Sequence, residues 1–234
     1  MLVLGRAAVT ASPVALLLLG VLMGMRHATD PDHVVAMTTI ITREPRKRSA
    51  IAAGAAWGVG HTATILLFGG AIILCGAAIP PRLGLALEMV VALMLILLGA
   101  FNLVRRAPRG RHPHVHAGAG PGAGRGLRRG FFVGVVHGLA GSAAVALLVL
   151  STIQSHGWAL VYLAIFGAGT VLGMMTLTAA MTLSLAAVSR RSGAIDRALT
   201  ALSGVASIAF GLVLCYRLTL VDGLFSELPR WTPR

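Results

Sequence analysis

The stretch GMRHATDPDH, residues 24–33, interrupts an otherwise apolar run that extends from Pro13 to about Ile41. It places an arginine, two histidines and two aspartates within eight residues, around Pro31. Proline lacks a backbone N–H and clashes with the preceding turn, so the run predicts a helix that breaks near Pro31. Broken helices are tolerated at membrane depth only where they are buried in protein or line a cavity. We therefore expect these polar residues to face the protein interior.

The composition predicts a membrane protein. The chain has 234 residues, of which 56% are hydrophobic and 12% are charged, whereas about a quarter of the residues in an average soluble domain are charged. A run of about 20 apolar residues spans a bilayer. Six runs reach that length: 13–42, 50–79, 83–104, 130–153, 158–188 and 195–220. The expected fold is an all-α polytopic protein with six transmembrane helices, embedded in a lipid bilayer.

Basic residues alternate between the loops that join these runs. They gather between helices one and two, three and four, and five and six: Arg43, Arg46, Lys47, Arg48, Arg105, Arg106, Arg109, Arg111, Arg125, Arg128, Arg129, Arg190, Arg191 and Arg197. The second loop holds only Arg82. This is the positive-inside pattern. It predicts cytoplasmic basic loops, both termini outside and a place in the cell (inner) membrane. The net charge of +13 therefore does not indicate nucleic-acid binding.

A signal peptide and a disulfide or thiolate metal site are both disfavoured. A signal peptide is an alternative for the first run, but its removal would discard the most polar motif of the chain, so we keep it as helix one. Cys75 and Cys215 both lie in apolar runs. Two such cysteines indicate neither a disulfide framework nor a thiolate metal site.

The chain divides into two similar halves. We expect a first three-helix repeat over 1–104, a basic His/Gly/Pro-rich cytoplasmic loop over 105–129, and a second three-helix repeat with a short tail over 130–234. The run GVLMGMRHATDPDHVVA from Gly20 aligns with GFFVGVVHGLAGSAAVA from Gly130, and this pairs His27 with His137. Three helices per half invert the second half, which is the plan of many secondary transporters with a site at the bilayer midplane.

The alignment has a second feature and an alternative explanation. At nearly the same offset, WGVGHT at Trp57 aligns with FGAGTV at Phe166. However, a chain with 29 glycines aligns with itself by chance rather easily. Glycines spaced by four also let helices approach closely, and four such pairs occur: Gly20/Gly24, Gly54/Gly58, Gly130/Gly134 and Gly169/Gly173.

The polar stretch predicts an intramembrane site. A charge near the bilayer centre costs about 2.5–3.5 kcal/mol, so Arg26, Asp30 and Asp32 are expected to avoid lipid. On a regular helix His27, Asp30 and His33 follow one another at i, i+3 and i+6, while Asp32 points elsewhere unless the helix unwinds. Arg26 and Asp30 are four residues apart and could pair, which would lower the net charge of the cluster. The alternative is a helix that ends here in a solvated loop.

Imidazole and carboxylate ligands without thiolate suit divalent nickel, cobalt or zinc. His61 follows WGVG and His137 follows FFVGVV, and either could instead be a packed, hydrogen-bonded histidine. The candidate metal ligands are His27, Asp30, Asp32, His33, His61 and His137, supported by Arg26, Thr62 and Ser142. His112, His114 and His116 either bind metal weakly or simply belong to a solvated loop.

These motifs resemble a known family. RHATDPDH contains His-x4-Asp-His as His27, Asp32 and His33, and it closely resembles the signature of the nickel/cobalt transporter (NiCoT) family, in which this motif in an early helix is required for metal selection and transport. GHTATI at Gly60 resembles the family's second-helix motif and so implicates His61. Longer members have about eight helices and an acid-bearing later motif, whereas the comparable VGVVHGLAGSAAV here has no acid. The chain thus resembles the short six-helix branch, which includes urease accessory membrane proteins.

The resemblance implies a secondary transporter that moves Ni²⁺ or Co²⁺ and holds no permanent cofactor. Two alternatives stay open: an exporter of the same architecture, and a non-transporting accessory protein that delivers metal to a nickel enzyme and its maturation proteins. An enzyme is not expected. The sequence HGLAGSAA suggests a serine protease, but the last helix carries no histidine base and no His-Glu-x-x-His motif occurs. Nickel versus cobalt, the direction of transport and a homo-oligomeric state are left open.

Overall fold

The computed structural model describes residues 13–42, 47–75, 79–104, 123–139, 153, 155–189 and 193–231. Every regular element in these residues is a helix. The elements are α1 (Pro13–His27), α2 (Pro31–Ile41), α3 (Lys47–Cys75), α4 (Pro81–Val104), α5 (Ala123–Gly138), α7 (His156–Ser189), α8 (Gly193–Tyr216) and the short π-helix η1 (Arg217–Val221). The all-helical expectation is confirmed for these residues.

Within the described residues, four helices are long and apolar enough to cross a membrane: Arg48–Cys75, Pro81–Val104, His156–Leu185 and Ala194–Val221. They match four of the six predicted spans. Their outer faces carry large apolar side chains that are more than half exposed, such as Leu67, Leu97 and Leu212. Exposed apolar surface on this scale is expected where the surrounding medium is lipid.

The other two predicted spans appear in the described residues only as shorter helices. The run 13–42 forms α1 and α2, and neither is long enough to span a bilayer alone. The run 130–153 begins inside α5, which starts at Ala123 within the predicted loop 105–129. Residues 140–152 lie outside the described residues, as do His112, His114 and His116. The described part of the chain therefore shows four of the six predicted spans as single long helices and the first as two helices with the predicted break between them.

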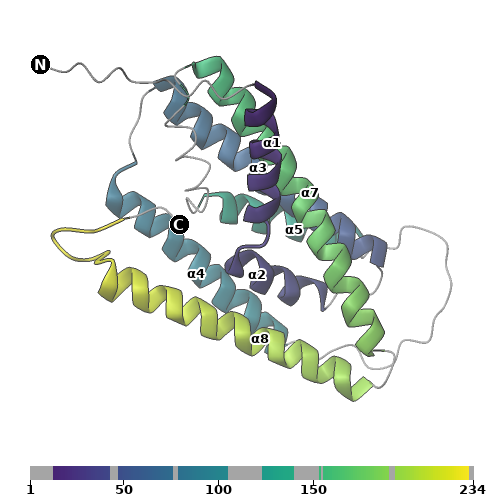
Figure 1. Cartoon of the computed structure of the whole chain (residues 1–234). Coiled ribbons are helices and arrows are strands. Elements are labelled where there is room, and N and C mark those ends of the chain that lie inside the picture. The colour runs from purple at the N-terminus through teal and green to yellow at the C-terminus, as the bar shows by residue number, and fades with distance from the viewer. Residues whose placement is uncertain are drawn as a thin grey trace, which may run out of the picture.

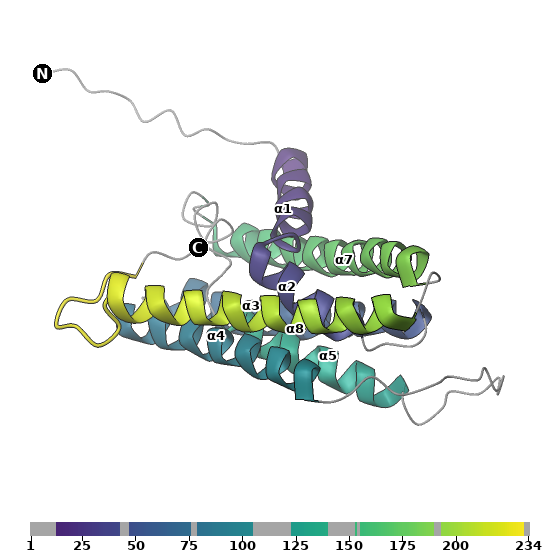
Figure 2. The ribbon, with the colours of Figure 1, turned by 90° about the horizontal axis from the view of Figure 1, so that it is seen from below.

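The predicted break at Pro31 is confirmed. Helix α1 ends at His27, and α2 begins at Pro31 with Asp30 as its N-cap residue in an extended conformation, φ −60° and ψ 145°. Proline is favoured at the first helical position because its missing N–H has no intrahelical partner there. Figure 1 shows α1 and α2 joined by this short turn beside α7, and Figure 2 shows α1 projecting away from the layer of long helices.

Glycines set the close packing of the helices, as the four-residue spacing predicts. A Cβ atom added at Gly24 on α1 would meet the backbone of Phe166 and Thr170 on α7. A Cβ atom at Gly134 on α5 would meet the carbonyl oxygen of Trp57 on α3. Small residues are needed at such crossings because membrane helices associate mainly through close van der Waals contact. Helix α4 lies along α8 in the same way (Figures 1 and 2).

Candidate metal centre

The break in the first helix brings four histidines together. His27 ends α1, His33 lies in the first turn of α2, His61 lies on α3 and His137 on α5. All four are buried, with at most 5% exposure. The ring centroid of His33 lies 4.7 Å from that of His27, 5.1 Å from His61 and 4.6 Å from His137. His33 is therefore the centre of the cluster.

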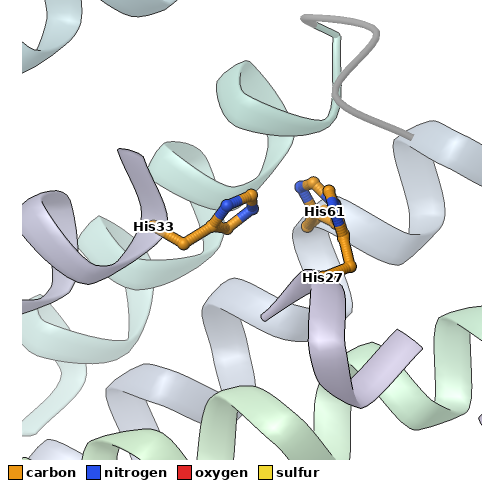
Figure 3. A group of neighbouring side chains, drawn as sticks. All are labelled: His27, His33 and His61. Carbon is orange, nitrogen blue, oxygen red and sulfur yellow. The ribbon is translucent and has the colours of Figure 1, made fainter. Parts of the chain in front are cut away.

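One group of candidate ligands is made only of histidines. Ligand atoms of His27, His33 and His61 all lie within 4.8 Å of one another. Nε2 of His27 and Nε2 of His61 are 3.0 Å apart. Figure 3 shows the three side chains converging from separate helical segments, with His33 on one side and His27 and His61 on the other. We call this group the three-histidine station.

A second group adds a carboxylate. Ligand atoms of Asp32, His33 and His137 also lie within 4.8 Å of one another. His137 Nε2 is 2.9 Å from Asp32 Oδ2, and His33 Nδ1 is 3.1 Å from Asp32 Oδ1. The turn before Pro31 thus brings Asp32 to the histidines, which is the unwound alternative considered above. We call this group the aspartate station; it shares His33 with the first.

Asp30 has a different place from the one that the i, i+3, i+6 pattern predicts. Its Oδ2 lies 2.8 Å from Nδ1 of His27, and it belongs to neither station. Histidines that bind metals usually donate their second ring N–H to a carboxylate in this way, which fixes the tautomer. The pair of Arg26 with Asp30 that the spacing allows is not among the described ion pairs: Asp30 pairs with His27, and Arg26 is exposed.

Of the two predicted supporting hydroxyls, the structure describes that of Thr62, which bonds to another helix. Thr62 donates a hydrogen bond to the carbonyl oxygen of Gly167 at 3.1 Å and so joins α3 to α7. Ser142 lies outside the described residues. Thr62 therefore stabilises the packing of α3 against α7 beside the site.

Trp57 is a neighbour of the site that the sequence reasoning missed. Its fully buried ring stacks on His33, with centroids 5.7 Å apart and planes at 16°, and meets His137 edge-on at 5.3 Å. Trp57 and His61 are four residues apart on α3 and so share one face of that helix. This spacing predicts that Trp57 lies near the site, because it places Trp57 on the side of α3 that carries His61.

The donor set fits a divalent transition-metal ion. Nitrogen ligands lie about 2.0–2.1 Å from such an ion, so two ligands at adjacent positions are roughly 2.9–3.4 Å apart. The 3.0 Å between Nε2 of His27 and Nε2 of His61 and the 2.9 Å between His137 and Asp32 lie in this range. Among the described residues, His33 Nε2 is buried without a hydrogen-bond partner, and such an atom is costly unless it binds something.

Comparisons with known proteins support a family. The chain is 35% identical over 217 residues to the urease accessory protein UreH of Bacillus sp. (strain TB-90), covering 90% of this chain and 95% of that protein. It is 28% identical over 207 residues to the chloroplast protein FOR GROWTH AND FERTILITY 2 of Arabidopsis thaliana, and 28% identical over 212 residues to FOR GROWTH AND FERTILITY 1 of the same plant.

These alignments cover 83% and 82% of this chain, but only 54% and 56% of the two plant proteins. No family model and no solved structure matches the chain. The name of the bacterial relative describes an accessory to an enzyme, which agrees with the expectation that the chain is not itself an enzyme. At this identity and coverage, the chain belongs to the family of the urease accessory protein UreH.

Proposed function

We propose that the chain carries Ni²⁺ or Co²⁺ across the cell membrane through the two overlapping stations at the helix break. The observation that carries this proposal is the convergence of four buried histidines and Asp32 from α1, α2, α3 and α5. Imidazole and carboxylate ligands without thiolate suit these ions. Intramembrane ionisable residues are expensive, and they mark ion pathways by default.

The relationship to a urease accessory protein favours nickel as the cargo, because urease is a nickel enzyme. It also keeps a second candidate in view, in which the chain binds nickel in the membrane and passes it to maturation proteins without moving it across. Both candidates need the same site. They differ in whether metal crosses a sealed membrane.

The packing of the helices supports the inverted repeat on which alternating access depends. If α5 corresponds to α1, α7 to α3 and α8 to α4, a two-fold operation exchanges the α1/α7 contact with the α5/α3 contact. Both contacts are extensive, and the self-matching pairs α3/α7 and α4/α8 are also in contact. The pairing of elements is the one expected of two halves that face each other in opposite senses.

Individual crossings follow the same correspondence. Gly24 on α1 packs against the carbonyl oxygen of Phe166 on α7, and Gly134 on α5 packs against the carbonyl oxygen of Trp57 on α3. The sequence alignment pairs Gly24 with Gly134 and Phe166 with Trp57. Equivalent glycines therefore meet equivalent aromatic residues on the opposite half.

The rings beside the site repeat this arrangement. Phe166 contacts His27 with centroids 5.5 Å apart, and Trp57 contacts His137 at 5.3 Å. The two aligned histidines thus each lie against an aromatic residue of the other half. A rocking movement of one half against the other would change what surrounds His33, where the halves meet.

The helix ends next to the basic loops support the proposed orientation. The start of α3, the end of α4, the start of α5, the end of α7 and the start of α8 lie toward one end of the molecule (Figures 1 and 2). Under the positive-inside rule this end faces the cytoplasm. The proposed location is the cell membrane, with both termini outside.

The deciding experiment is metal uptake into sealed proteoliposomes that contain only this chain. We expect saturable accumulation of radioactive nickel or cobalt that His33→Gln reduces at least tenfold. His156→Gln is the matched control, because His156 is exposed at the start of α7 and away from the cluster. Stoichiometric nickel binding without accumulation would instead establish the accessory function. Wild-type uptake by correctly inserted His33→Gln would refute the site.

A further inference from the structure

We propose that the site passes a single metal ion between the three-histidine station and the aspartate station, with His33 as a ligand in both. This inference rests on the proposed function, since it describes how the same site would move its cargo. It goes beyond it in assigning two successive binding positions that share one ligand residue, His33.

The ligand sets themselves carry the first step. The three-histidine station takes His27 from α1 and His61 from α3, whereas the aspartate station takes Asp32 from α2 and His137 from α5. Only His33 belongs to both. Its ring lies 4.6–5.1 Å from those of the other three histidines, so a small rotation or shift of this one side chain changes its ligand partners.

Charge makes the two stations exclusive. Neighbouring stations that share one imidazole would hold two dications a few ångströms apart, in a buried place where repulsion is weakly screened. The site offers one carboxylate, Asp32, as a direct ligand, and Asp30 lies behind His27. These charges balance one divalent ion, so the stations are used in turn.

Exposure gives the stations an order. Asp32 retains 19% exposure of its side chain, whereas the members of the three-histidine station are 0–5% exposed. Asp30 is more exposed, at 32%, but it contacts His27 Nδ1 and belongs to neither station, so within the stations an arriving ion meets the Asp32 carboxylate first. It then exchanges Asp32 and His137 for His27 and His61, the deeper and uncharged set.

The aligned histidines connect this exchange to movement of the halves. His27 and His137 occupy equivalent places in the proposed repeat, and each belongs to one station only. A tilt that draws α5 away from His33 while α1 approaches it would favour the three-histidine station. The opposite tilt would favour the aspartate station.

The test separates binding from flux in single-station variants. Purified full-length protein in detergent is titrated with Co²⁺ by equilibrium dialysis, and its coordination is read by X-ray absorption. His61→Gln removes a ligand from the three-histidine station, His137→Gln from the aspartate station, and His33→Gln from both. His156→Gln is the control. The same proteins are then assayed for Co²⁺ flux in proteoliposomes.

We expect one Co²⁺ per wild-type chain. His61→Gln and His137→Gln should each still bind one ion, with affinity reduced less than tenfold and with different spectra, because the former leaves a carboxylate in the ligand set. Their flux should fall at least tenfold. His33→Gln should lose at least a hundredfold in affinity.

Two results would overturn the two-station scheme. If His61→Gln and His137→Gln lose affinity as severely as His33→Gln, all ligands form one site. If the wild-type chain binds two ions at once, the stations are independent; this measurement needs no variant and so does not depend on variant folding. Absence of wild-type flux would refute transport alone, because stoichiometry and spectra would still decide whether two stations exist.

Discussion

The contact between Asp30 and His27 gives a quantitative prediction about metal affinity. Oδ2 of Asp30 lies 2.8 Å from Nδ1 of His27, which directs Nε2 of His27 toward Nε2 of His61 at 3.0 Å. A hydrogen bond to a charged group is worth about 1.5–3 kcal/mol, and loss of such an outer partner typically lowers metal affinity roughly 10–100-fold. Because Asp30 is 32% exposed, solvent screening places the loss toward the lower end. We expect Asp30→Asn to weaken Ni²⁺ binding about 10–30-fold.

The assay is calorimetric titration of the detergent-solubilised full chain with Ni²⁺. Asp196→Asn is the matched control, because Asp196 is an exposed acid in the first turn of α8, on a different element from the site. The control should bind as wild type does. An affinity for Asp30→Asn within twofold of wild type, or an equal loss in Asp196→Asn, would refute the outer-ligand role of Asp30.

Three further predictions concern protons, aromatic contacts and packing. Two ring nitrogens 3.0 Å apart, such as those of His27 and His61, share one proton in a hydrogen bond, and metal must displace it. The affinity for metal should therefore fall as pH falls, by up to about tenfold per pH unit for each displaced proton. The number of protons released on metal binding measures this directly. Equal metal affinity from pH 8 to pH 6 would contradict the prediction. Trp57→Leu removes the stack on His33, an aromatic contact worth about 0.5–1.5 kcal/mol, so Ni²⁺ binding should weaken roughly two- to tenfold. Trp57→Phe should largely restore the affinity. Equal Ni²⁺ affinity of both variants would argue against a positioning role of Trp57. Gly134→Leu forces a side chain against α3, and such overpacking costs about 1–3 kcal/mol. The melting temperature in a thermal unfolding assay should therefore fall by several degrees. Gly157→Ala should leave the melting temperature unchanged, because among the described residues its added Cβ would meet only Ser155 Oγ at 3.8 Å.

The sequence predicts the class of fold well because apolar length is a strong signal. Four of the six runs are continuous helices long enough to cross a bilayer, and Pro31 marks the observed break. Hydropathy does not show how neighbouring apolar helices are oriented relative to each other. An apolar run from 13 to 42 is compatible with one helix, two stacked helices or two helices at an angle. Contacts with other helices, such as that of Gly24 with the backbone of α7, are not contained in the hydropathy of the run.

The sequence names the side chains of the candidate site but not their arrangement. The four histidines and Asp32 were identified from residue type and membrane setting, and the structure gathers them. Asp30 was assigned by helical spacing, which does not hold across the turn: Asp30 becomes the N-cap residue of α2 and turns to His27. Trp57 escaped notice because an aromatic residue on an apolar helix has no distinguishing pattern, and only its spacing from His61 suggested its place.

The helix break and the candidate metal site are one feature rather than two. In an unbroken α-helix, His27 and His33 would be separated by six residues, or about 9 Å along the axis, and by roughly 120° around it. The structure instead brings their ring centroids to 4.7 Å. The proximity therefore exists only because α1 and α2 are joined at an angle by the turn at Asp30 and Pro31. A movement that straightened this turn would separate His27 from His33. The three-histidine station should therefore form or come apart as the angle between α1 and α2 changes.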